Sequence, residues 1–283
     1  MLDDFAVFIL SHGRPDNVIT YRTLLKAGYT GKIFIVIDNE DKTADQYYIN
    51  FGNKVIQFDK AAIAETFDEG DNFQDRRAVI YARNACFDIA RELGITYFIE
   101  LDDDYVHFAY QINDNFEGEF NRVQKNIDAI FEYYLDFYKS IPAKSIAMSQ
   151  GGDWQGGLQN DIDSSIGRRR KCMNSFFCST ERPFQFIGRI NEDVNTYSWY
   201  QGLGNLYLTH PLVRLQQKET QHNPGGMTEL YLDAGTYIKS FYTVMYQPSS
   251  VSIALRFRYG RLHHLINWEC TVPCIISEDY RKP

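Results

Sequence analysis

The sequence predicts an α/β fold, in which a mostly parallel β-sheet is flanked by helices and the second half adds an antiparallel portion. Over the first hundred residues, short apolar runs alternate with segments whose apolar residues recur at helical spacing. The connections between these segments are short, which favours parallel strands joined by crossover helices. The chain has 283 residues with 44% apolar content, enough to bury a sizeable core.

Strands and helices alternate along the first half. Mostly apolar runs identify four strands buried on both faces of a sheet: residues 5–10, 32–38, 53–59 and 96–101. A helix is expected over 16–29, where Val18, Tyr21 and Leu25 recur and Gly28 stands at the C-terminal cap position. A second helix is expected over 76–94, ended by Gly94, with these residues on its inner face: Val79, Ala82, Cys86, Ile89 and Leu93.

The second half has a different pattern, with longer helices and short antiparallel strands. The expected elements are a helix over 120–141, a strand over 144–149, a glycine-rich loop over 151–157, antiparallel strands over 171–179 and 184–190, a helix over 227–246, and a hairpin over 251–268 that turns at Gly260. The inner stripe of the first helix is Val123, Ile127, Ile130, Tyr134 and Tyr138, and that of the second is Leu230, Ala234, Tyr237, Phe241 and Met245. No repeat or linker divides the chain, so residues 1–283 are interpreted as a single domain.

Composition excludes some classes of protein. No run of about 18 apolar residues is present, so no membrane span is expected. The first ten residues carry acids where a secretory signal carries Lys or Arg. The five cysteines follow no zinc-site spacing and are interpreted as reduced, which indicates a cytoplasmic protein. The net charge of −8 argues against a nucleic-acid partner, although residues 167–172 and 256–261 are basic clusters.

Three polar loops are expected to meet beyond the carboxyl ends of the parallel strands, where ligands bind in such sheets. They are residues 11–15, 38–41 and 102–104. In extended backbone, Asp102 and Asp104 point to one side and Asp103 to the other. Two carboxylates on one side suit Mg²⁺ or Mn²⁺, and such a metal can neutralise a diphosphate. The alternative is a solvated acidic turn that ends the strand.

Two further groups of polar residues are candidates for chemistry. On the helix over 76–94, Arg76 shares a face with Arg83, and Arg77 shares one with Asn84; arginines there could bind phosphates, or could be ordinary surface charges. The acid pair Glu192–Asp193 opens a probable helix, where an acid can be a cap or a general base.

Histidines could complete a metal site formed by two aspartates. The candidates are His12, His222, His263 and His264. His263 and His264 are adjacent, and adjacent side chains in a strand face opposite ways, so at most one of them should reach a metal. A structural role is the alternative for each histidine.

Together these residues resemble a GT-A glycosyltransferase, which has a Rossmann-type sheet and uses a nucleotide-diphosphate sugar and a divalent metal. More narrowly, several segments resemble the phage-type DNA-base glycosyltransferases, also called TET-associated glycosyltransferases: ILSHGRPDNV, RRAVIYARNACFDIA, YFIELDDDY, GGMTELYLDAGTYIKSFYTVMY and LHHLINW. The resemblance covers nearly the whole chain. It implies transfer of a sugar to a hydroxymethylated pyrimidine, with 5-hydroxymethylcytosine in phage DNA expected, and Mn²⁺ or Mg²⁺ as cofactor.

The resemblance also implies roles for particular residues. Residues 1–110 would bind the nucleotide sugar and residues 111–283 the acceptor. Metal ligands would be Asp102, Asp104 and either His263 or His264, with His222 as a further candidate. Donor-binding residues would be Ser11, Arg14, Asp38, Arg83, Asn84, Asp102 and Asp103. Asp193, with Glu192 as the alternate, would take a proton from the acceptor hydroxyl in an inverting enzyme, and would only position the acceptor in a retaining one.

A DNA acceptor has modest support in the residues themselves. Trp154 in the glycine-rich loop could stack on a flipped base, or could be an ordinary packed side chain. The basic residues that could contact phosphates are Arg168, Arg169, Arg170 and Lys171, together with Arg256, Arg258 and Arg261.

Other functions remain open at this point. A GT-A enzyme could act on a glycan, lipid or protein acceptor. A nucleotidyltransferase is disfavoured because residues 11–17 contain one glycine and no lysine, whereas such enzymes usually carry a glycine-rich phosphate loop with a nearby lysine. A non-catalytic module that binds DNA or a sugar nucleotide would leave the aspartates without a chemical role.

Overall fold

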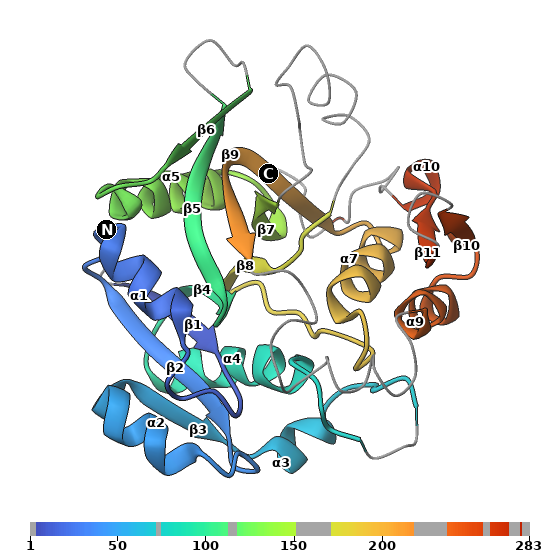
Figure 1. Ribbon diagram of the computed structural model, residues 1–283. Helices are drawn as coiled ribbons and strands as arrows, with labels where there is room; N and C mark the ends of the chain where they lie inside the picture. Colours follow the sequence, from blue (N-terminus) through green and yellow to red (C-terminus); the bar gives the residue numbers. More distant parts are fainter. Residues whose placement is uncertain are drawn as a thin grey trace.

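A nine-stranded sheet forms the centre of the computed structural model, which describes residues 4–71, 75–112, 118–150, 171–217, 237–256, 261–271 and 278 (Figure 1). The strand order is β3-β2-β1-β4-β8-β7-β9-β5-β6. The first four strands in this order are parallel: β3 (Val55–Phe58), β2 (Lys32–Asp38), β1 (Phe5–Leu10) and β4 (Tyr97–Asp102). All six residues of β1 are buried, as expected for a strand covered on both faces.

The rest of the sheet mixes parallel and antiparallel pairs. β8 (Ser175–Ser179) runs antiparallel to both β4 and β7 (Ala143–Gln150), and β9 (Leu206–Gln217) is parallel to β7. β5 (Tyr105–Ile112) runs antiparallel to β9 and to β6 (Gly118–Arg122) at the edge. The predicted fold class is confirmed: the chain has a mixed α/β sheet with an antiparallel portion, consistent with a GT-A-like fold.

Helices cover both faces of the sheet, and each face has its own apolar core. On one face pack α1 (Ile19–Lys26), α2 (Ala44–Phe51) and α5 (Ile127–Ser140). On the other face pack α3 (Lys60–Ala64), α4 (Ile80–Glu92) and α7 (Glu192–Gly202). Alternate residues of β1 divide between the two cores, with Val7 and Ile9 in one and Ala6 and Phe8 in the other.

The helix expected over 16–29 forms as the shorter α1, and its expected apolar stripe is confirmed in part: Val18 is buried and Tyr21 packs against the core. Leu25 is 50% exposed, whereas Thr20, Thr23 and Leu24 are buried. The threonines face inward because the Thr20 hydroxyl donates to the Asp102 carbonyl at 2.6 Å and the Thr23 hydroxyl to the Tyr105 carbonyl at 2.9 Å. Gly28 follows the helix with a φ of +85°, as its predicted capping role requires.

The helix expected over 76–94 forms as the shorter α4. Arg76 and Arg77 precede it, so the prediction that each shares a helix face with Arg83 or Asn84 is wrong. Arg76 is ion-paired with Glu40, and Arg77 with Asp75. Cys86 and Ile89 are buried as expected, but Leu93 is 44% exposed. Gly94 ends the helix with a φ of +65°.

The helix expected over 120–141 begins later than predicted, at Ile127, because residues 118–122 form the edge strand β6. Its apolar stripe is confirmed, since these residues are all buried: Val123, Ile127, Ile130, Tyr134 and Tyr138. The strand expected over 184–190 does not form. There the backbone of Phe186 pairs with the Asn84 side chain, which donates at 3.1 Å and accepts at 2.8 Å.

Helix α9 (Ile238–Tyr246) turns the opposite face inward from the one predicted. Tyr237, Phe241 and Met245 are about half exposed, whereas Ser240, Tyr242 and Thr243 are buried. The polar face turns inward because it packs on α7, where Thr243 hydrogen-bonds Asn195 at 2.9 Å. Leu230 and Ala234 lie outside the described residues.

The predicted C-terminal hairpin is confirmed as β10 (Val251–Arg256) and β11 (Arg261–Ile266), which lie beside α9 and α10 (Trp268–Thr271) at the right of Figure 1. Gly260, where the turn was expected, is outside the described residues. The described cysteines are free thiols: Cys86, Cys172, Cys178 and Cys270. No helix in the described part of the chain is both long and apolar enough to cross a membrane.

Candidate active site

The three polar loops meet at the carboxyl edge of the parallel strands, as predicted. In register, Leu10 at the end of β1 is the partner of Asp102 at the end of β4. The Ser11 hydroxyl donates to Asp103 at 2.5 Å, and the Arg14 guanidinium lies 3.2 Å from the same carboxylate. The loop after β2 joins them through the Gly13 amide, which donates to Asp41 at 2.7 Å.

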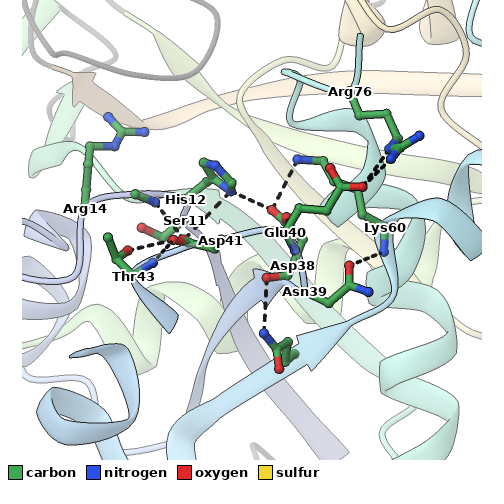
Figure 2. A network of polar contacts seen from close by, with 12 residues as sticks. Ser11, His12, Arg14, Asp38, Asn39, Glu40, Asp41, Thr43, Lys60 and Arg76 are labelled. Carbon is green, nitrogen blue, oxygen red and sulfur yellow. Dashed lines mark hydrogen bonds and ion pairs between the residues drawn. The ribbon is translucent and has the colours of Figure 1, made fainter. Parts of the chain in front are cut away.

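Asp38, at the end of β2, is a buried carboxylate held between two basic side chains (Figure 2). Its Oδ2 lies 2.7 Å from His12 Nδ1 and 3.3 Å from Lys60 Nζ. Burial opposes its ionisation, but the hydrogen bond to His12 and the charge of Lys60 hold the pKa of Asp38 below its usual range. The same hydrogen bond raises the pKa of His12. Asp38 is therefore a fixed anion at the sheet edge.

The aspartate triplet divides as the alternation predicted, although Asp103 and Asp104 lie in a turn rather than in the strand. Asp103 is buried against Ser11 and Arg14. Asp102 and Asp104 both face Gln217, whose Nε2 lies 3.3 Å from Asp102 Oδ2 and 3.5 Å from Asp104 Oδ1. The two carboxylates thus converge on one side chain at the end of β9.

The electrostatics of this pair suit a divalent cation. Burial, with the neighbouring charges of Asp102 and Asp103, raises the pKa of Asp104 to about 7. A cation between Asp102 and Asp104 would remove that repulsion. In the described part of the chain no three His, Cys, Asp or Glu side chains form a ready-made metal site. Mg²⁺ is commonly bound through one or two carboxylates together with water and substrate phosphates, and the pair fits that mode.

Gln217 is a site residue that the sequence reasoning missed. It is oriented by Asn174, whose side-chain amide donates to Gln217 Oε1 at 3.0 Å, so the Gln217 amide hydrogens face the aspartates. The Asn174 carbonyl also accepts a hydrogen bond from the Tyr105 hydroxyl. No local pattern marks Gln217, because its place depends on the pairing of β9 with β5, in which it is the partner of Tyr105.

The acid pair opens α7, as predicted, and both side chains are buried. Glu192 Oε1 accepts from Arg83 Nε at 3.0 Å, whereas Asp193 Oδ1 accepts from the Val194 amide at 2.7 Å. Burial is the largest cause that raises the pKa of both carboxyls. The residue before the pair, Asn191, has a left-handed backbone with a φ of 61°.

Arg83, expected at the donor, is only 2% exposed. Its guanidinium lies among three carboxylates: Nε at 3.0 Å from Glu192, Nη2 at 2.9 Å from Asp102 and Nη1 at 3.7 Å from Glu100. Asn84, the other donor candidate on α4, is hydrogen-bonded through its amide to the backbone of Phe186. Both side chains are therefore engaged by protein groups.

The histidines differ in their surroundings. The rings of His263 and His264 on β11 lie against each other, with centroids 4.4 Å apart, so the prediction that they face opposite ways is wrong. Ligation of a metal by either ring stays a prediction. His222 lies outside the described residues, and His12 is bound to Asp38.

Most of the expected acceptor residues lie outside the described part of the chain, namely Trp154, Arg168, Arg169, Arg170 and Arg258. Lys171 is half-buried, and its carbonyl accepts the Thr209 hydroxyl at 2.7 Å. Arg256 and Arg261 are register partners at the end of the β10–β11 pair where the chain passes from one strand to the other.

The chain was compared with known proteins in three ways. No curated protein matches the chain significantly. A solved structure titled "Crystal Structure of a Mycobacterial Protein" is 8% identical, with a TM-score of 0.44, and the match covers 93% of this chain and 83% of that chain. The model of the TET-associated glycosyltransferases matches residues 5–226, which include the polar loops, the aspartate triplet, Arg83 and the acid pair. The chain therefore belongs to the TET-associated glycosyltransferase family, and it is a glycosyltransferase.

Proposed function

We propose that this enzyme transfers a sugar from a nucleotide-diphosphate donor, expected to be a UDP-sugar, to a hydroxymethylated pyrimidine in phage DNA. The expected acceptor base is 5-hydroxymethylcytosine, and the expected cofactor is Mn²⁺ or Mg²⁺. The observation that carries the proposal is the convergence of Asp102 and Asp104 at the sheet edge, next to a buried acid pair. Family membership supports the sugar transfer, and the acceptor follows from the resemblance of the sequence to DNA-base glycosyltransferases.

On the donor side, Asp102 and Asp104 would hold the metal, which when bound neutralises the diphosphate as it leaves. Asp38 is fixed by His12 and Lys60, and Asp103 by Ser11 and Arg14. These side chains line the edge where the nucleotide of the donor would lie. Their mutual contacts orient them before a ligand arrives, which lowers the entropic cost of binding.

On the acceptor side, Asp193 is the better candidate for the base. Glu192 is ion-paired with Arg83 at 3.0 Å, so its carboxylate is engaged by a buried side chain, whereas the Asp193 carboxylate accepts from the Val194 amide. Burial raises the pKa of both carboxyls, which suits either as a base, so the choice rests on these contacts. In an inverting reaction, Asp193 takes the proton of the acceptor hydroxyl as that oxygen attacks the anomeric carbon. In a retaining reaction, Asp193 positions the acceptor.

The test is direct. The protein is incubated with Mn²⁺, a panel of nucleotide sugars, and either hydroxymethylated or plain DNA, and nucleosides are analysed by mass. We expect a gain of one sugar mass on the hydroxymethylated base only. Asp104→Asn should lower the rate by at least about 100-fold, because several kcal/mol of charge stabilisation is lost with the metal.

The matched control is Asp88→Asn on the exposed surface of α4, which should transfer at the wild-type rate. If the enzyme glycosylates a glycan, lipid or protein and leaves hydroxymethylated DNA unchanged, the DNA acceptor is wrong. If Asp104→Asn transfers as fast as Asp88→Asn, the metal role is wrong.

A further inference from the structure

We infer, resting on the proposed function of the site, that Arg83 is a positioning residue that holds Asp102 and Glu192 in a fixed relation and does not contact the donor. Its side chain is 2% exposed, so a diphosphate would have to displace protein groups to reach it. Two nitrogens of the guanidinium hydrogen-bond different carboxylates, Nε that of Glu192 and Nη2 that of Asp102, while Nη1 lies 3.7 Å from Glu100.

The orientation of the Arg83 guanidinium is fixed by aromatic rings packed against it as well as by the carboxylates bonded to its nitrogens. Its central carbon lies 4.7 Å from the Phe176 ring centroid and 5.7 Å from that of Phe186. Packing against the aromatic rings fixes the plane of the guanidinium, and the hydrogen bonds to the carboxylates fix how the guanidinium is rotated within that plane. A lysine could supply the charge but could not bond two carboxylates in the same planar geometry.

The two carboxylates that Arg83 hydrogen-bonds belong to opposite sides of the proposed reaction. Asp102 ends β4 and is one of the two candidate metal ligands, whereas Glu192 is the first residue of α7. Asp193, the candidate base, follows Glu192 in the same helical turn. One buried side chain therefore joins a candidate metal ligand to the helix that carries the candidate base, and a small misplacement of such groups costs much of the rate.

The experiment compares Arg83→Lys with Arg91→Lys, an identical change on the same helix, where Arg91 is exposed and pairs with Asp88. For Arg83→Lys we expect kcat to fall by about 10- to 100-fold. The Kd of UDP measured by calorimetry without a metal ion should stay within about twofold, because a displaced Asp102 acts on UDP only through the metal, whereas a direct contact of Arg83 with the diphosphate would be lost in either condition. Arg91→Lys should leave both constants unchanged.

Glu192→Gln provides a second variant, because it keeps an oxygen for Arg83 Nε and the shape of the side chain. It should lower kcat without changing the Kd of UDP, and its effect should be less than additive with that of Arg83→Lys. The inference is overturned if Arg83→Lys raises the Kd of UDP measured without a metal ion by tenfold or more, since Arg83 would then contact the donor. It is also overturned if Arg83→Lys has wild-type kcat.

Failure of the proposed function can be told apart from failure of the inference about Arg83. A wild-type protein that transfers no sugar to DNA overturns the acceptor, while the binding measurement still decides the role of Arg83. Unchanged affinity of Arg83→Lys for UDP in the absence of metal supports positioning, and weakened affinity under that condition contradicts it.

Discussion

Asn174 and Asn191 are the two non-glycine residues with positive φ in the described part of the chain, and each adjoins the site. Asn174 orients Gln217 and accepts from Tyr105, whereas Asn191 immediately precedes the acid pair. Asparagine adopts the left-handed region more readily than most residues, but the conformation still costs free energy. Strain of this kind persists where the surrounding fold enforces it, as at binding and catalytic sites.

His210 should make the protein less stable in acid. Burial against aromatic rings lowers the pKa of His210 to about 4, and its Nδ1 accepts the Leu212 amide at 3.3 Å, which requires the neutral ring. The unfolded chain binds the proton near its ordinary pKa of about 6.5, so stability falls as the pH drops below that value. Between pH 7.5 and 5.0, wild type should lose about 2 kcal/mol more unfolding free energy than His210→Phe.

Urea unfolding at the two pH values measures this difference, and the variant is its own control because all other groups titrate alike. An equal loss of unfolding free energy in wild type and in His210→Phe would show that the His210 ring is protonated at pH 5.0 in the folded protein.

Some of the site could be predicted from single residues, and some could not. The division of Asp102 and Asp104 from Asp103 was predicted from the period of an extended chain, a local property, and it holds although Asp103 and Asp104 lie in a turn. The position of Gln217 is not local, because it depends on which strand lies beside β5. Arg83 could be identified as a site residue, but its burial among carboxylates depends on the approach of α7.

At the scale of helices, apolar periodicity predicted α5 well, α1 in part and α9 poorly. α5 packs on an apolar face of the sheet, so its apolar stripe faces inward. α1 instead meets free carbonyls near the end of β4 and the start of β5, where threonine hydroxyls are the better partners. α9 meets the polar side of α7 for a similar reason. The apolar stripe of a helix faces inward only where the surface that it packs on is apolar. The sequence of the helix alone does not show whether that surface is apolar or polar.

The ends of α1 and α4 allow a matched test of close packing. Gly28 and Gly94 each follow a helix with positive φ, at +85° and +65°. A Cβ on Gly28 would lie 3.0 Å from the Lys125 backbone, whereas one on Gly94 would meet nothing within 4 Å. Gly94→Ala should therefore cost about 1 kcal/mol of unfolding free energy from backbone strain alone. Gly28→Ala should cost about 2–3 kcal/mol, because the start of α5 must also shift.

Denaturant unfolding of both variants measures the two costs. The prediction concerns their difference, and equal values would mean that the Lys125 backbone moves away freely.

At the scale of the whole molecule, the four parallel strands were predicted, but the order of strands in the sheet was not. β8, β7 and β9 lie between β4 and β5, although β4 and β5 are neighbours in sequence. Parallel βαβ units have strong local rules, which explains the success over residues 1–101. Insertion of distant strands depends on long-range pairing, and both β5 and β9 were absent from the prediction.

The placement of β8, β7 and β9 between β4 and β5 leads to a test of the prediction that the chain is a single domain. All three tryptophans, Trp154, Trp199 and Trp268, lie in residues 111–283, while circular dichroism reports on helices and strands of the whole chain. Because one sheet joins both halves, we expect both signals to give the same midpoint in urea. Separate midpoints, with fluorescence and circular dichroism changing at different urea concentrations, would instead show two units that unfold independently.

The contact between Gln217 and the aspartates joins positions more than a hundred residues apart. A molecule that bound there would tie β9 to the turn between β4 and β5, and it would bind only the folded chain. By mass action, such a ligand adds about 2.7 kcal/mol of stability at a hundred times its Kd. The melting temperature of the protein can therefore report which nucleotide sugar it prefers before any acceptor is known.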